Sequence, residues 1–209
     1  MALSCIPSSV LSGANCTENP AGLGNFLFAV PNTSDYIASI IPDDTKNQYV
    51  ITPAGSGKAA LKGFRIDYKS QTGQYTSDDN GTGKGWSGTG TGRVELSEDQ
   101  MAYTSRILHN SDKYLYFLAT GKKVKVDEAM VDEYIVVGNE NGEAEWSVKA
   151  DSGTKRSDDH GQTFTVKCDY QLYPTTKWYG TIEQADASAS PSGGSAAGGK
   201  PASGSETGH

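Results

Sequence analysis

The fold depends most on residues 61–120, which read LKGFRIDYKSQTGQYTSDDNGTGKGWSGTGTGRVELSEDQMAYTSRILHNSDKYLYFLAT. Near the start, Phe64, Ile66 and Tyr68 alternate with charged residues, which is the period-two pattern of a strand with one face in water. A segment rich in glycine and threonine follows, then a helix signal, and then an aromatic strand. This order predicts a mainly β fold with a single packed helix.

The helix is predicted over about residues 97–110. Ser97 and Gln100 form a capping box, in which the two side chains satisfy each other's free backbone amides. Four side chains then share one face at a spacing of 3.6 residues: Met101, Thr104, Ile107 and Leu108. We therefore expect a helix from Glu98 to His109 that lies on a sheet and buries one stripe.

The segment from Gln71 to Gly92 is dense in glycine and threonine. This composition disfavours a packed core, so we expect a long hairpin tip or an exposed loop, with strand structure resuming at Val94. Long loops on β scaffolds often carry contacts to partners. In and beside the segment we select five candidate contacts to a partner: Tyr75, Asp78, Asp79, Trp86 and Arg93.

Further strands are predicted on both sides of this segment from short runs of apolar and aromatic residues. They are Asn25–Val30, Lys46–Thr52, Tyr114–Ala119, Phe164–Tyr170 and Lys177–Ile182. Because Tyr114–Ala119 is apolar on both faces, we expect it to be a central strand. Ile135–Val137 and Ala144–Val148 flank Asn139–Gly142, which predicts a hairpin with a tight turn.

The composition divides the chain into three parts. Residues 1–45 contain proline at four near-regular positions and are expected to form an irregular arm. Residues 46–184 are expected to form one β domain with the helix. Residues 185–209 are almost all Ala, Ser, Gly and Pro, and they cannot bury enough apolar surface to offset the entropy of ordering, which predicts a flexible tail.

Charge and cysteine content exclude several classes of protein. The net charge of -7 argues against a basic surface for nucleic acid. Cys5, Cys16 and Cys168 lack the spacing of a disulfide framework or a zinc site, so we expect unpaired thiols. The amino terminus has no signal-peptide pattern, and no window is long and apolar enough to span a membrane. We expect synthesis in the cytosol.

Several motifs resemble ligand-binding sequences, but each lacks a feature that the chemistry requires. Pro53–Ala59 looks like a phosphate-binding loop, yet Ala59 has no hydroxyl for Mg²⁺. Gly83–Gly88 fits the letters of GxGxxG, but no helix is predicted after it. The aspartate pairs at 78–79 and 158–159 lack calcium-loop spacing. No nucleophile elbow or Cys/His signature is present, so we expect no enzyme, no cofactor and no metal.

Aromatic residues leave a carbohydrate-binding β-sandwich module open as an alternative. Trp86, Trp146, Trp178 and eleven tyrosines could stack on pyranose rings. In the strands of a β domain, however, aromatic residues are more often core or interface residues.

The order of the predicted elements resembles that of bacteriophage tail tube proteins: an irregular arm, a strand, a long loop, a strand, one helix, a strand and then hairpins. This β-sandwich-like or barrel-like fold is shared with the type VI secretion tube. Two stretches, Gly63–Tyr75 and Asp158–Val166, are similar to virion proteins of phages that infect Bacteroidota. The resemblance covers about residues 25–183.

The resemblance implies a structural virion protein located in the phage tail, a tube subunit that assembles into stacked hexameric rings. DNA would pass through the rings without specific binding, which suits an acidic protein because a negative lumen repels phosphates. Its partners would be further copies and other tail proteins, with no membrane. Met1–Asp44 and Gln71–Gly92 would contact neighbouring subunits and the next ring, where β-augmentation would cover exposed edges. The helix Glu98–His109 would pack on the outer face of the sheet. A capsid decoration or other non-tube virion protein is the alternative within this class.

Overall fold

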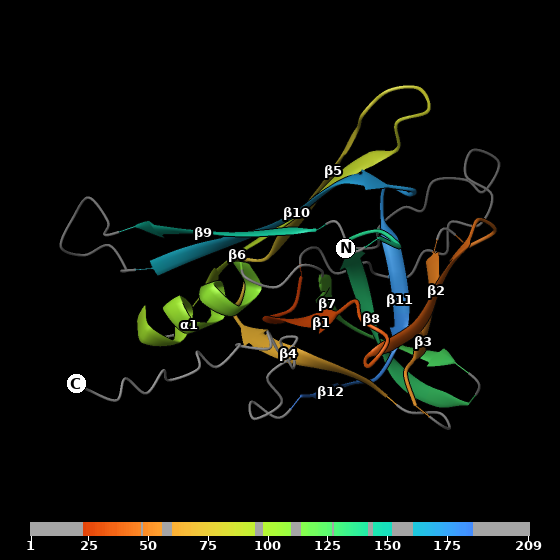
Figure 1. The fold of residues 1–209 in the computed structure, drawn as a ribbon, viewed down its shortest axis with the longest axis horizontal. Helices are drawn as coiled ribbons and strands as arrows, with labels where there is room; N and C mark the ends of the chain where they lie inside the picture. Colours follow the sequence, from red (N-terminus) through yellow and green to blue (C-terminus); the bar gives the residue numbers. More distant parts are fainter. Residues whose placement is uncertain are drawn as a thin grey trace, which may run out of the picture.

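The computed structural model describes residues 23–46, 48–55, 60–94, 98–109, 114–126, 128–141, 144–151 and 161–185. These residues form two β-sheets and one helix (Figure 1), which confirms the predicted mainly β fold with a single helix. Residues 1–22 of the expected arm and 186–209 of the expected tail lie outside the described residues.

The larger sheet has the strand order β12-β4-β1-β7-β8-β11-β3-β2. Its strands are β1 (Phe26–Pro31), β2 (Ile37–Asp43), β3 (Gln48–Pro53), β4 (Leu61–Asp67), β7 (Tyr114–Val126), β8 (Ala129–Val137), β11 (Thr176–Gly180) and β12 (Ile182–Gln184). The smaller sheet has the order β5-β6-β10-β9. Its strands are β5 (Gln74–Asp79), β6 (Trp86–Val94), β9 (Glu145–Asp151) and β10 (Gly161–Gln171), and the helix α1 spans Glu98–His109.

The larger sheet is rolled into a barrel-like shape because β11 and β12 are consecutive in the chain but far apart in the strand order. β11 pairs with β8, whereas β12 pairs with β4. Only Thr181 separates the two strands, and one residue reaches at most about 3.6 Å. β4 and β8 must therefore approach each other around the roll, and the Leu61 amide donates to the Thr181 carbonyl at 3.2 Å at this closure.

β7 separates two hydrophobic cores, as its two apolar faces predict. Leu115, Phe117 and Ala119 point into the roll, where they pack with Tyr134 and Trp178. The alternate side chains face the smaller sheet and are also buried: Tyr114, Tyr116 and Leu118. The prediction of a central strand is confirmed.

The glycine- and threonine-rich segment Gln71–Gly92 contains β5, a turn and most of β6, which form a hairpin of the smaller sheet. The predicted hairpin is present, but most of the segment is strand paired within the sheet, so its prediction as an exposed loop was wrong. Gly88, Gly90 and Gly92 of β6 face the larger sheet, and the threonines between them face away. A Cβ atom at Gly90 would lie 2.5 Å from Leu118 Cδ1, and one at Gly92 would lie 2.6 Å from Phe164 Cε1. Apart from Val94 at the end of β6, the apolar volume of this core is supplied by the neighbours of β6.

The predicted hairpin around Asn139–Gly142 was also wrong. β8 pairs with β7 and β11, while β9 pairs with β10 in the other sheet, so the connection crosses between the sheets. Asn139 is buried in this crossover. Its Oδ1 accepts from the Asn141 amide at 3.0 Å, and its Nδ2 donates to the Tyr170 carbonyl at 3.4 Å.

Two strands lie inside the segment expected to be an irregular arm. β1 is a central strand between β4 and β7, which confirms the strand predicted at Asn25–Val30. β2 is the last strand of the larger sheet. Pro42 fits there because a proline at a sheet edge removes no hydrogen bond to a neighbouring strand.

The helix α1 has the predicted bounds but a different position. It contacts β9, and Leu108 belongs to the core between the two sheets. The helix therefore packs on the inner side of the smaller sheet, beside the sandwich (Figure 1), and not on an outer face. Ser97 and Asn110, the predicted ends of the helix, lie outside the described residues.

The glycine stripe of β6 predicts a face-specific response to substitution. Gly90→Val should lower the free energy of unfolding by about 1–3 kcal/mol, because the new side chain overlaps Leu118 and Val166. Thr91→Val is the matched control on the opposite face of the same strand and should change it by less than about 0.5 kcal/mol. Urea denaturation measures both. Equal effects of the two substitutions would contradict this account of β6.

Candidate interaction surface

The β5–β6 hairpin extends beyond the rest of the molecule at the top of Figure 1. Its turn is closed by two backbone hydrogen bonds, from the Asn80 amide to the Gly85 carbonyl at 3.1 Å and from the Lys84 amide to the Gly81 carbonyl at 3.0 Å. Gly81, Gly83 and Gly85 all have positive φ angles, which glycine adopts without strain. Of the GxGxxG letters, Gly83 and Gly85 are thus turn glycines and Gly88 lies in β6, so a strand and not a helix comes directly after the turn.

Three of the five candidate contact residues come together near the end of the hairpin. Asp79 lies directly opposite Trp86, and Asp78 lies opposite Ser87. Both aspartates are exposed and Trp86 is half-buried. Arg93 is not part of this group, because it lies at the far end of β6, opposite Thr163.

Tyr75 is half-buried, and its hydroxyl is bonded within the molecule. Its hydroxyl lies 3.0 Å from Gln171 Oε1 and 2.8 Å from the Pro174 carbonyl, and it can donate its one hydrogen to either. Burial raises the pKa of Tyr75 to about 12. Gln171 Nε2 in turn donates to the Val136 carbonyl at 3.0 Å. Tyr75 therefore helps to fix the β10–β11 connection that joins the two sheets.

The outer face of the smaller sheet is polar and rich in hydroxyl groups. Side chains directly opposite each other in the strand registers share this face: Thr76 with Thr89, Thr91 with Thr165, and Thr165 with Ser147. Its charged side chains balance: Asp78, Glu145 and Asp169 are acidic, and Arg93, Lys149 and Lys167 are basic. The acidic excess of the chain does not lie on this face.

The smaller sheet is open on both sides. Within the described part of the chain, β5 and β9 each have a strand neighbour on one side only. An open edge presents backbone groups that can pair with a further strand.

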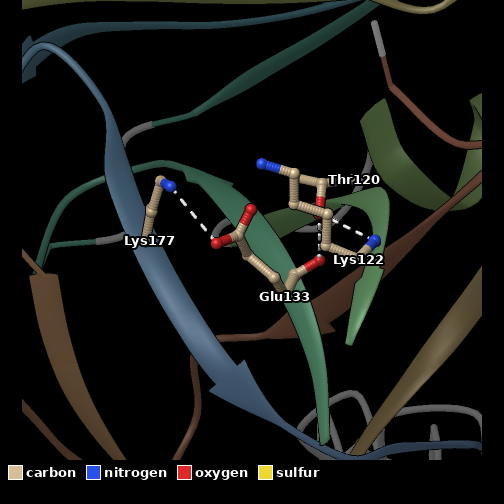
Figure 2. A network of polar contacts seen from close by, with 4 residues as sticks. All are labelled: Thr120, Lys122, Glu133 and Lys177. Carbon is tan, nitrogen blue, oxygen red and sulfur yellow. Dashed lines mark hydrogen bonds and ion pairs between the residues drawn. The ribbon is translucent and has the colours of Figure 1, made fainter. Parts of the chain in front are cut away.

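Figure 2 shows a second polar group, formed by residues of β7, β8 and β11. Glu133 on β8 is only 6% exposed, and its carboxylate lies 3.2 Å from Lys177 Nζ on β11. The Glu133 carbonyl accepts from Thr120 Oγ1 at 3.0 Å, and Thr120 Oγ1 accepts from the Lys122 amide at 3.3 Å. These contacts join β7, β8 and β11, which is a structural role.

Two of the three tryptophans proposed for sugar stacking are core residues. Trp146 is 4% exposed and stacks on Phe164 with ring centroids 5.2 Å apart. Trp178 is 8% exposed and packs inside the roll against Phe117. Neither ring offers a free face to a sugar, so the interpretation of these two residues as a carbohydrate platform was wrong.

The structure also assigns roles to residues that the sequence did not single out. Gln171, Glu133 and Asp169 each hold neighbouring strands together through their side chains. No local pattern marks them, because each is a single polar residue whose partners come from distant parts of the chain.

The described residues contain no group of three or more His, Cys, Asp or Glu side chains placed to hold a metal ion. The aspartate pair at 158–159 and Ala59 of the loop-like motif lie outside them. In the same described part of the chain, no helix is both long and apolar enough to cross a bilayer. Cys168 is buried between the sheets, and Cys5 and Cys16 are not among the residues described.

No protein-family model matches the chain, and it has no significant similarity to a curated protein or to a solved structure.

Buried tyrosines predict a loss of stability at alkaline pH. Burial raises the pKa of Tyr75 and Tyr134 to about 12 and also raises that of Tyr68 and Tyr116, from an ordinary value near 10. A raised folded pKa means that the neutral phenols stabilise the fold fully below pH 10 and that this contribution falls as the pH rises through 12. Ultraviolet titration should show these tyrosines ionising at a higher pH than exposed tyrosines, or together with unfolding. If all tyrosines of the folded protein ionised with a single midpoint near pH 10, this prediction would be contradicted.

The Glu133–Lys177 pair predicts a second effect on stability. Lys177→Met should lower the free energy of unfolding by about 1–2 kcal/mol, because it leaves the buried carboxylate without its cation. This loss of stability is smaller than that expected for a fully buried ion pair, because the Lys177 side chain is 40% exposed. Lys62→Met, at an exposed position of β4, is the control in the same denaturation experiment. A cost no larger than that of the control would count against the role of the pair.

Proposed function

We propose that the protein is a phage tail tube subunit that assembles into stacked hexameric rings around a DNA-conducting channel. The observation that carries the proposal is the smaller sheet, which among the described residues has open edges at β5 and β9 and a hydroxyl-rich outer face. The resemblance of the element order and of Gly63–Tyr75 to phage virion proteins supplies the biological context.

The open edges allow a ring to form by strand pairing between copies. Neighbouring strands of the smaller sheet are antiparallel, so β5 and β9 run in opposite directions. If β5 of one copy pairs with β9 of the next, the antiparallel alternation continues without a break. Such a head-to-tail contact uses different surfaces on the two copies, and it closes into a ring when the rotation between copies divides a full turn.

A channel lined by the outer face of this sheet would suit the passage of DNA. Hydroxyl groups of Thr89, Thr91 and Thr165 offer weak contacts to any sequence. Tight binding to phosphates requires clustered cations. Here Lys167 is paired with Asp169 at 2.6 Å, and the other charges on the face nearly cancel. The channel would be near neutral and not strongly acidic, which differs from the lumen expected from the net charge.

The remaining surfaces have roles in the same proposal. The end of the β5–β6 hairpin, with Asp78, Asp79 and Trp86, would contact the next ring. The arm that precedes β1 would contact neighbouring subunits. Tyr75 serves the fold of the subunit, since its hydroxyl is bonded internally.

Edge substitutions test the proposal against assembly. Thr76→Lys places a charged side chain on the open strand β5 and should prevent rings, because lysine on an edge strand disfavours strand pairing. Thr91→Lys is the matched control, since it lies on the same face but on the internal strand β6. Negative-stain electron microscopy should show rings or tubules for the wild type and the control only, with unchanged thermal unfolding for both variants.

Compact monomers of the wild-type protein at every concentration would overturn the proposal. Closed trimers would favour a capsid decoration protein in its place.

A further inference from the structure

The hairpin is joined to β10 by a ladder of backbone pairs that is interrupted near its end. The β6–β10 register is regular from Val94 opposite Gln162 to Gly88 opposite Cys168. It then shifts, so that Trp86 lies opposite Gln171 and β10 has one extra residue. Such a bulge leaves backbone groups out of the ladder and weakens the attachment of what lies beyond it.

Side chains supply the missing attachment at this point. Asp169, within the bulge, accepts from Ser87 Oγ at 2.7 Å through its carboxylate. Its backbone carbonyl accepts from Asn80 Nδ2 at 2.6 Å. Ser87 and Asn80 lie on opposite sides of the hairpin turn, so one residue of β10 bonds to both arms of the hairpin.

The Asp169 carboxylate is held in place and kept charged by its neighbour on β10. Lys167 Nζ lies 2.6 Å from Asp169 Oδ1. The hydrogen bonds from Lys167 and Ser87 hold the pKa of Asp169 below its ordinary value. A hydrogen bond to a charged acceptor is about twice as strong as one between neutral groups.

We propose that Asp169 is a positioning residue that fixes the direction of the outer half of the hairpin, residues 79–87. Without its two bonds, the hairpin pivots at the bulge while the sheet beneath it stays intact. The importance of this direction for assembly rests on the proposed function, because the end of the hairpin is the surface offered to the next ring.

Hydrogen exchange of the full chain tests the positioning role directly. In the double variant Asn80→Ala with Ser87→Ala, which leaves β10 unchanged, the amides of residues 79–87 should exchange at least about tenfold faster. Amides of β1 and β7 should be unaffected. Ser87→Thr, which keeps a hydroxyl, should retain slow exchange, and Thr76→Ala is a control on the same hairpin. Unchanged exchange in 79–87, or a uniform increase along the chain, would overturn the inference.

Electron microscopy of the same variants separates the inference from the proposed function. Faster local exchange together with rings that no longer stack supports both. Faster local exchange with normal tubules overturns the role of the hairpin's direction in stacking, while the ring proposal stands. If the wild type forms no rings, the ring proposal fails, and the exchange data alone decide whether Asp169 fixes the hairpin.

Discussion

The close approach of the two sheets at β6 is the constraint on which the rest of the structure depends. Three inward positions of this strand are glycine, and the space of the absent side chains is occupied by Leu118 from one sheet and Phe164 from the other. Phe164 can then stack almost parallel on Trp146, at an interplanar angle of 4°. With its inner face filled by neighbours, β6 carries its own polar side chains outward, and these form the hydroxyl-rich face of the smaller sheet.

The parts of the fold that could be predicted are those encoded over short distances. The bounds of α1 follow from a capping box and a stripe at helical spacing, and β7 is recognisable because Tyr114–Ala119 is apolar on both faces. Sheet membership could not be predicted in this way. Nothing near Asn139 indicates whether the strands on either side pair with each other, because that depends on what β10 offers to β9.

The strand β6 was not predicted from the sequence, for a different physical reason. Glycine has a low strand propensity because it has no side chain to pack against its neighbours. In this protein the alternation of glycine and threonine is itself a period-two pattern, with the empty position toward the core. The predicted contact residues also differ in position. Asp78, Asp79 and Trp86 flank the turn of the hairpin, whereas Tyr75 lies in the strand β5, where its hydroxyl reaches Gln171.

The sheet edges differ in how far they are protected against pairing with another chain. β2 carries Pro42 and a register shift between Ile37 and Ser39, both of which disrupt a regular edge. β5 has neither a proline nor a register shift: its register against β6 is unbroken from Gln74 to Asp79, and its charged residues, Asp78 and Asp79, are confined to the end beside the turn. A long-lived monomer would be expected to blunt such an edge. The regular edge of β5 is therefore easier to explain if another chain pairs with it in the assembled protein. The smaller sheet is accordingly the place to look for an interface.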